Sequence, residues 1–278
     1  MAADIAGWEK AGLLYEVDGD GAAWLRLNRP EKRNAMDRPL RSALLGAIHE
    51  VTEDPQVRAA VITGNGVAFS SGADLTQVGG AGEVPPERRR EGRNGSRTDG
   101  VLYGWSRLMN GIWNSEKPFL AAVNGIAAGG GCQLALACDL VIAHEDAQFW
   151  EVFVRRGLPL EGGGAWILTK LTSLVRAKEM AILGEPVPAD QAERWGLVNR
   201  VVPAAEWDET VRAWAKKLAS GPTIRIGHIK DQLNAAYEES MRQSFRDEVT
   251  FLHMGAGEDQ AEAMRAYAEK REPKFTGN

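Results

Sequence analysis

The sequence predicts an α/β protein whose C-terminal part is entirely helical. Strand-like and helix-like segments alternate up to about residue 202, and only helical patterns follow Pro203. Within the alternating part, a glycine-rich segment lies between a buried strand and an apolar helix. We therefore expect a mixed α/β core over residues 1–202, which holds the binding site, and a helical region over residues 203–278.

The elements can be assigned in chain order. Two short apolar runs, 13–17 and 23–27, flank an Asp-Gly-Asp-Gly turn and predict a β-hairpin. Apolar residues at helical spacing from Leu40 to Val51 predict a helix over 37–51. The other core elements expected are strands at 57–63, 118–123, 140–143 and 198–202, and helices at 101–114 and 132–137. The C-terminal helices are expected at 206–219, 223–236, 240–253 and 258–270.

Composition and charge exclude several classes of function. A formal net charge of −5 gives no general attraction to nucleic acid or to an anionic membrane. No window reaches the roughly 18 unbroken apolar residues of a membrane span, and the first residues lack the pattern of a secretory leader. Two cysteines make no disulfide framework, and no pair of the four histidines has metal-ligand spacing. We expect a cytoplasmic protein without a metal, and with neither nucleic acid nor membrane as a partner.

Residues 79–100 fit no compact element. They are rich in Gly, Pro and Arg and contain almost nothing apolar. Such a segment is typical of a solvated loop, but long loops inside compact domains often have a function. A basic lid near a phosphate-bearing ligand is the alternative.

The most informative segment is NGIAAGGG, residues 124–131. Glycines between a strand and a helix let the backbone approach a ligand and expose N–H groups at the helix N-terminus. That arrangement suits a phosphate or an oxyanion. The spacing does not match the G-x-G-x-x-G dinucleotide motif, and no Lys-Ser or Lys-Thr follows to complete a P-loop. Tight packing of the helix on the strand explains the glycines equally well.

A second segment, AFSSGADL at residues 68–75, follows another predicted strand after a turn. Two separate loops are thus available, and each can offer one backbone N–H to the same oxygen atom. A thioester carbonyl that becomes an enolate needs such a pair of donors. Loss of one donor of this kind typically lowers the rate by about 10²–10³.

Several ordered motifs resemble the enoyl-CoA hydratase/isomerase (crotonase) superfamily, and the resemblance covers nearly the whole chain. The motifs are LNRPEKRNAM at 27–36, AFSSGADL at 68–75, KPFLAAVNGIAAGGGCQLALACDLVIA at 117–143, AERWGLVNRVV at 192–202 and EKREPKF at 269–275. The resemblance implies a crotonase-like spiral of strand-strand-helix turns with a helical trimerisation tail. It also implies a homotrimer or a dimer of trimers that acts on acyl-CoA thioesters.

The resemblance carries specific residue roles with it. The N–H groups of Ala73 and Gly130 are expected to bind the thioester oxygen. Coenzyme A is expected to be part of the substrate, with no further cofactor. Its binding residues are expected on the two early loops, at Arg29, Lys32, Arg33, Ala35, Ser71, Ala73, Asp74 and Leu75. The tail of a neighbouring subunit is expected to contribute Lys274 and Phe275.

Departures from the family pattern bear on the chemistry. Hydratases of this family carry two glutamates, one directly after the Gly-Gly-Cys run and one after an Ala-Gln-Phe strand. This chain has Gln133 and Phe153 at those places. Addition of water needs a group that activates the water and a source for the second proton. Gln and Phe exchange no protons, so the ordinary hydratase pair is absent. We expect Gln133 and Phe153, together with Trp150, to line the acyl pocket, although each aromatic residue also fits a plain core position.

A carboxylate occurs elsewhere, at Glu161 in the segment GLPLEGGGAW. This segment resembles a branch of single-acid enoyl-CoA isomerases, in which one acid takes a proton from C2 and returns it to C4. The alternative is an acidic residue in the first turn of a helix over 162–171, where the helix dipole favours it. Glu151 is the other candidate acid, unless it is a surface residue or one that only supports the site.

One carboxylate suffices for an isomerase, because moving a double bond from C3 to C2 only shifts one proton from C2 to C4. We therefore expect a Δ3 to Δ2 enoyl-CoA isomerase that uses Glu161. The alternatives are an enoyl-CoA hydratase or another lyase with a rearranged acid, and a CoA-ester-binding pseudoenzyme. A nucleotide-binding oxidoreductase is a distant fourth, because the glycine spacing is wrong.

Overall fold

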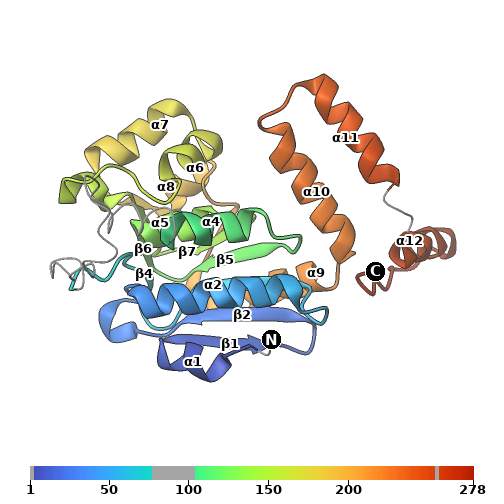
Figure 1. The fold of residues 1–278 in the computed structure, drawn as a ribbon, viewed down its shortest axis with the longest axis horizontal. Coiled ribbons are helices and arrows are strands. Elements are labelled where there is room, and N and C mark those ends of the chain that lie inside the picture. Colours follow the sequence, from blue (N-terminus) through green and yellow to red (C-terminus); the bar gives the residue numbers. More distant parts are fainter. Residues whose placement is uncertain (1–2, 77–103, 254–256) are drawn as a thin grey trace, which may run out of the picture.

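The computed structural model describes residues 3–76, 104–253 and 257–278 and places them in an α/β body with an arm of C-terminal helices (Figure 1). A six-stranded sheet runs in the order β1 (Leu13–Val17), β2 (Ala22–Leu27), β3 (Ala59–Gly64), β5 (Phe119–Val123), β7 (Leu140–His144) and β10 (Arg200–Val202). All neighbouring strands are parallel except the β1–β2 hairpin. The predicted hairpin and the alternation of strand and helix are confirmed.

A second, four-stranded sheet consists of short strands in the order β4 (Ala68–Ser70), β6 (Ile126–Ala128), β8 (Gln148–Trp150) and β9 (Val187–Pro188). From β3 to β8, strands of the first sheet therefore alternate along the chain with short strands of the second, and each such pair is followed by a helix. The helices of the three repeats are α4 (Ser106–Trp113), α5 (Gly130–Leu136) and α6 (Gly164–Leu171). This order is the expected spiral of strand-strand-helix turns. Apart from the Ala-Gln-Phe strand, the second sheet was not predicted.

The six-stranded sheet is covered on both faces, because successive side chains of a strand point to opposite sides. On β3, Ala60 and Ile62 face the larger core, which includes α2 (Arg38–Glu53), α4 and α5. Ala59 and Val61 face a smaller core formed with α9 (Trp207–Ala219). The remaining helices of the body are α1 (Ile5–Lys10), α7 (Leu174–Lys178) and α8 (Ala189–Arg194), with short turns η1 (Pro30–Lys32), η4 (Val152–Arg156), η5 (Glu179–Leu183) and η6 (Ala204–Glu206).

The C-terminal helical region continues from α9 into α10 (Thr223–Ala236), α11 (Met241–His253) and α12 (Glu258–Glu269). The predicted helices are confirmed, with ends within one residue of those expected. Lys230 of α10 fixes this helix to the body, because its buried Nζ donates to the Ile112 carbonyl at 2.7 Å and to Asp139 at 2.9 Å. Beyond this attachment the arm extends sideways from the body (Figure 1).

Candidate active site

Two loops of the second sheet meet at the carboxyl ends of neighbouring strand pairs. One loop follows β4 and carries Gly72 and Ala73, and the other follows β6 and leads into α5 at Gly130. A Cβ atom built on Gly72 would lie 2.5 Å from the Ala128 carbonyl oxygen and 3.2 Å from the Gly130 nitrogen. Main chain therefore packs directly on main chain here. Gly72 also has a φ of +87°, in the left-handed region that favours glycine.

The N–H groups of Ala73 and Gly130 are not used by the fold in the part of the chain that the structure describes. Met36 pairs with Ala73 in a parallel bridge, in which its N–H donates to the Gly72 carbonyl at 2.7 Å and its carbonyl accepts the Asp74 N–H at 3.1 Å. The bridge thus uses the groups on either side of Ala73, whose own N–H points away from Met36. Gly130 is the first residue of α5, so its N–H has no acceptor within the helix. The structure brings these two predicted donors onto adjacent loops.

A buried ion-pair network holds the loop that carries Ala73. The Asp74 carboxylate, only 3% exposed, lies 3.1 Å from both Arg29 Nη2 and Lys32 Nζ. It also accepts hydrogen bonds from the Thr76 hydroxyl at 2.6 Å and the Thr76 N–H at 3.1 Å. Arg29 in turn donates to the Ala35 carbonyl at 2.7 Å. The hydrogen bonds from Thr76 and Lys32 hold the pKa of Asp74 well below its ordinary value.

We expect Asp74→Asn to lower Tm by about 5 °C at neutral pH, because charge-assisted hydrogen bonds within the protein are lost. The folded-state pKa of Asp74 lies below its ordinary value of 3.8, so its stabilisation is present above about that pH and is lost as the pH falls below it. Thermal unfolding at pH 7 and pH 3 measures both effects. Asp190→Asn is the control, because its ion pair with Arg194 is about two-thirds exposed. Equal shifts in the two variants would contradict a special role for the Asp74 network.

The predicted CoA-binding residues of the two early loops lie together. The Ser71 N–H donates to the Arg33 carbonyl at 2.9 Å, and the Ser71 hydroxyl donates to the Lys32 carbonyl at 3.2 Å. Lys32, Arg33 and Leu75 are exposed, whereas Ala35 and Asp74 are buried. A buried carboxylate repels a phosphate, so Asp74 can only support binding by orienting its cationic neighbours.

Lys274 and Phe275 are not brought to these loops within one chain. The Phe275 carbonyl accepts a hydrogen bond from Arg58 at 3.1 Å. Arg58 lies just before β3, whose other end leads to the Ala73 loop. The six residues of β3 span about 20 Å, so the tail lies at the wrong end of the strand for contact with these loops. The expected contact of these residues with coenzyme A therefore requires a second copy of the chain and stays a prediction.

Glu161 lies in a glycine turn that packs on α5. Helix α6 begins at Gly164 rather than at residue 162, so the alternative that placed Glu161 in its first turn is wrong. A Cβ atom on Gly162 would lie 2.6 Å from Gln133 Oε1, and one on Gly164 would lie 2.2 Å from Gln133 Nε2. Gln133 is itself three residues after Gly130 on α5. The turn that presents Glu161 is therefore adjacent to the helix whose first N–H is a predicted oxyanion donor.

Trp105 connects these two parts of the site and was not identified from the sequence. Its ring would lie 2.4 Å from a Cβ atom on Gly130, and its own Cβ would lie 3.3 Å from one on Gly162. One buried side chain thus contacts both Gly130 at the start of α5 and the Glu161 turn. Only a helical pattern over 101–114 is visible in the sequence, and nothing in it distinguishes Trp105 from a core residue. The structure describes this segment from residue 104, and residues 79–100, predicted as a solvated loop with a basic lid as the alternative, lie outside the described residues.

Glu151 is fully buried behind α5, so the surface alternative for this residue is wrong. Burial raises the pKa of Glu151 to about 8, although hydrogen bonds from Cys132 and Gln133 lower it in part. The Gln133 amide nitrogen lies 3.5 Å from Glu151 Oε2, while Glu151 Oε1 has no hydrogen-bond partner among the described residues. The carboxyl group therefore favours its neutral form in a dry environment.

The other predicted pocket residues have separate environments. The Phe153 ring would lie 3.8 Å from a Cβ atom on Gly129, directly before α5. The Trp150 carbonyl accepts the Gly129 N–H at 2.8 Å, but its indole N–H is held by the Gly184 carbonyl at 2.6 Å. Phe153 thus lies beside Gly129 and Gln133 lies on α5, whereas Trp150 contacts Gly129 through its main-chain carbonyl.

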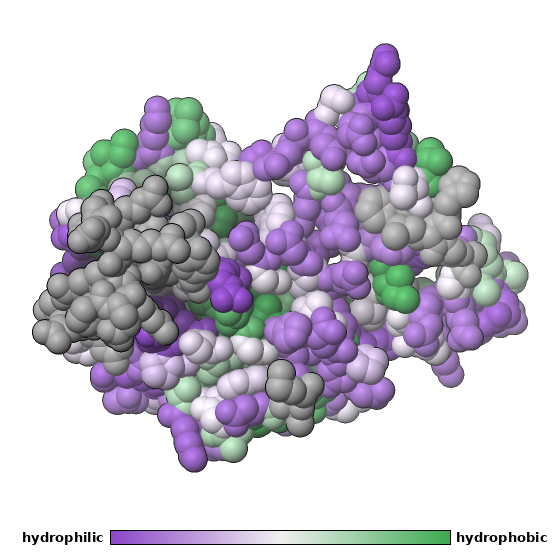
Figure 2. All heavy atoms as spheres, viewed as in Figure 1, coloured by the Kyte–Doolittle hydropathy of each residue, from purple (hydrophilic) through white to green (hydrophobic). Residues whose placement is uncertain are grey.

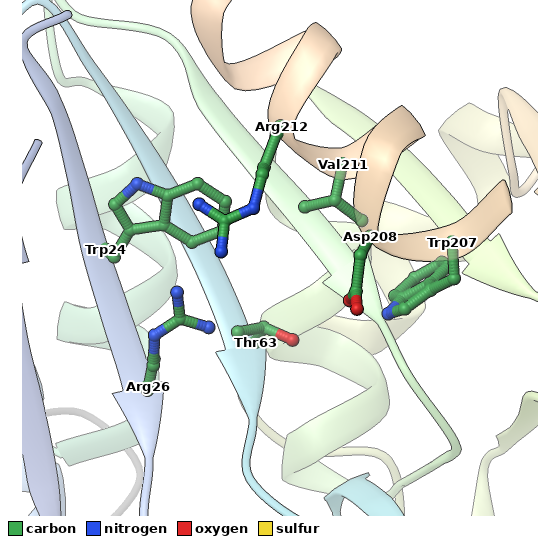
Figure 3. A pocket seen from close by; sticks show the side chains of 7 residues that line it. All are labelled: Trp24, Arg26, Thr63, Trp207, Asp208, Val211 and Arg212. Carbon is green, nitrogen blue, oxygen red and sulfur yellow. The ribbon is translucent and has the colours of Figure 1, made fainter.

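A separate small cavity of about 50 Å³ lies between the six-stranded sheet and α9 (Figure 3). It is lined by Trp24, Arg26, Thr63, Trp207, Asp208, Val211 and Arg212. None of the predicted site residues is among them, and the cavity lies on the face of the sheet opposite α5. No group of three or more metal-ligating side chains occurs within the described ranges. Across the same ranges, every helix is too short or too polar to cross a membrane.

Comparison with known proteins finds related proteins over nearly the whole chain. The family model described as enoyl-CoA hydratase/isomerase matches residues 18–278. A protein from Rhodobacter capsulatus with the name "Probable enoyl-CoA hydratase" is 36% identical over 95% of this chain and 98% of its own length. The 1,2-epoxyphenylacetyl-CoA isomerase of Escherichia coli is 33% identical over 95% of this chain and 98% of its own length. A crystal structure of enoyl-CoA hydratase from Mycobacterium smegmatis has a TM-score of 0.84 at 30% identity, covering 95% of this chain and 98% of that one.

Proposed function

The chain belongs to the enoyl-CoA hydratase/isomerase family, and we propose that it shifts a double bond of an enoyl-CoA from C3 to C2. The family places the chain among enzymes of acyl-CoA thioesters. The close approach of the Ala73 and Gly130 loops is the observation that carries the enolate chemistry, and the absence of the ordinary hydratase pair directs that chemistry to isomerisation. Two N–H donors on adjacent loops are suited to hold a thioester oxygen as it gains negative charge.

The proposed reaction needs one group that moves a proton. Glu161 removes a proton from C2 of the 3-enoyl thioester, and the electron pair forms a dienolate whose charge lies on the thioester oxygen. The same carboxyl group then delivers the proton to C4, and the double bond is left between C2 and C3. Atoms and charge balance without water or any cofactor beyond the coenzyme A of the substrate.

Three observations favour isomerisation over hydration. Gln133 and Phe153 stand where hydratases of the family carry their two glutamates. The turn that presents Glu161 packs directly on Gln133. One relative is named as an isomerase of a CoA ester. Other relatives are named as hydratases, so hydration is the second candidate, and Glu151 is then the rearranged acid.

The proposal includes a second copy of the chain. Large apolar side chains of the C-terminal arm are exposed, among them Leu233, Phe245 and Met264. A further exposed apolar group, which includes Leu174 and Val175, lies on and after α7, where apolar side chains gather in Figure 2. Exposed apolar surface of this kind favours assembly. A homotrimer or a dimer of trimers would cover it and bring Lys274 and Phe275 of one copy towards the CoA loops of another.

The test is to offer the protein a 3-enoyl-CoA and a 2-enoyl-CoA in deuterated water. Liquid chromatography with mass spectrometry separates the two esters and detects deuterium and added water. We expect the 3-enoyl ester to become the 2-enoyl ester, with at most partial deuterium uptake, because direct internal return of the proton leaves little label. A product heavier by one water would replace the proposal with hydration. Unchanged esters that still bind would identify a binding protein.

A further inference from the structure

Glu151 occupies a place that the proposed reaction does not use. It follows β8 directly and is 0% exposed. Its polar contacts in the described structure come from α5 alone, from the Cys132 thiol and from the Gln133 amide at 3.5 Å. Its second oxygen, Oε1, has no partner among the described residues. A buried acid with so few contacts calls for a physical explanation, because burying a polar group is costly.

Glu151 contacts Gln133, and Gln133 in turn packs against the turn that contains Glu161. The Gln133 amide is 1% exposed, and its two polar atoms lie against Gly162 and Gly164 so closely that neither glycine has room for a Cβ atom. Rotation of that amide would displace the turn. The same amide nitrogen also donates to Glu151 Oε2 at 3.5 Å, the one polar partner outside the turn that the described structure gives it.

We propose that Glu151 is a positioning residue, which holds the Gln133 amide against the glycine turn and so fixes the place of Glu161. The inference rests on the proposed role of Glu161 and adds a second acid that does not exchange protons with the substrate. Glu151 acts through Gln133, and burial keeps it in its protonated form. No cation faces it from α5, and no ion pair to it is present among the described residues, so its ionised form would be an uncompensated buried charge.

Because Glu151 holds its place as a neutral acid, we expect turnover to depend on pH. Burial raises the pKa of Glu151 to about 8, against an ordinary value of 4.5. As the pH rises through about 8, the buried group ionises. The Gln133 N–H still donates to the carboxylate, but an uncompensated buried charge favours a rearrangement of the side chains around it, which displaces the Gln133 amide. Turnover is then expected to fall on the alkaline side, because the Glu161 turn loses its support.

Two substitutions separate this role from its alternatives. Glu151→Gln keeps the size and one carbonyl oxygen but cannot ionise, whereas Glu151→Ala removes the contact with Gln133. We expect Glu151→Gln to keep kcat within about twofold to threefold at pH 7 and to lose the alkaline fall. Glu151→Ala is expected to lower kcat by at least about tenfold with little change in KM. Glu185→Gln, an exposed acid, is the control and should keep the profile of the unmodified protein.

Each contrary outcome is decisive. If Glu151→Gln keeps the alkaline fall, the titration of Glu151 is not its cause and the proposal is wrong. If Glu151→Gln is as inactive as Glu151→Ala while it still folds and binds a CoA ester, Glu151 exchanges protons with the substrate and is no positioning residue.

The pH dependence of thermal unfolding is a second measurement. It does not require enzyme activity, so it tests the inference independently of the proposed function. The folded-state pKa of Glu151 lies above its unfolded value, so its stabilisation is complete below about 4.5 and is lost as the pH rises to about 8. We expect the Tm of the unmodified protein to fall over this range relative to that of Glu151→Gln. If Tm changes with pH in the same way in both proteins, Glu151 is not a buried neutral acid. The inference is then wrong even if the isomerase activity is found.

Discussion

Replacement of Glu161 by glutamine is expected to lower turnover of a 3-enoyl-CoA by about 10²–10⁴-fold, with binding of the CoA ester largely retained. The amide has nearly the same shape as the carboxyl group but cannot accept a proton from C2. The turn around it stays intact, because Gly162 and Gly164 still pack on Gln133. The measurement is kcat with a 3-enoyl-CoA, together with the dissociation constant of a saturated acyl-CoA.

The matched control is Glu179→Gln, which makes the same chemical change at a residue on the surface whose ion pair with Arg176 is solvated. We expect this variant to keep full activity. If Glu161→Gln also keeps full activity, the acid/base role moves to Glu151 or to another residue. If Glu161→Gln loses binding as well as turnover, the turn has changed shape, and Glu161→Asp then tests the chemistry at the same position.

Substitution of Gly72 by alanine is expected to lower kcat/KM by about 10²–10³-fold, the typical effect of losing one oxyanion donor. The added methyl group would lie 2.5 Å from the Ala128 carbonyl, so the loops after β4 and β6 must move apart. Gly72 has a φ of +87°, which strains alanine further. The proposed binding of one oxygen by the Ala73 and Gly130 N–H groups would then be lost.

Gly157→Ala separates the oxyanion geometry from backbone strain. Gly157 also has a positive φ, of +65°, but a Cβ atom there meets nothing within 4 Å. We expect Gly157→Ala to lose some stability and to keep kcat/KM within about threefold. Thermal unfolding of both variants corrects for differences in folding. Wild-type kcat/KM in folded Gly72→Ala would contradict the role of the two loops.

Most of the fold could be predicted from the hydrophobic patterns of its longer helices and strands. Helix α2 and the four C-terminal helices follow from apolar residues at helical spacing, and the β1–β2 hairpin follows from its turn. The short strands β4, β6 and β9 have only two or three residues each, too few for a period of two to be visible. Their pairing depends on segments far apart in the chain, which a local pattern does not contain.

The site was predictable to a similar degree. The resemblance of two motifs to a known family was enough to propose Ala73 and Gly130, and the structure places them on adjacent loops. The contacts of Trp105 with Gly130 and Gly162, and the complete burial of Glu151, depend on packing between three different repeats of the fold. Neither residue has a sequence signature for such contacts, so only the structure identifies them.

The most direct measurement is the infrared spectrum of a saturated acyl-CoA, labelled with ¹³C at the thioester carbonyl, free and bound to the protein. Two N–H donors on one oxygen weaken the C=O bond, so we predict a carbonyl band below its frequency in water. The shift should be largely lost in Gly72→Ala and kept in Gly157→Ala. A bound ester whose carbonyl band stays at its frequency in water would contradict the binding of one oxygen by Ala73 and Gly130.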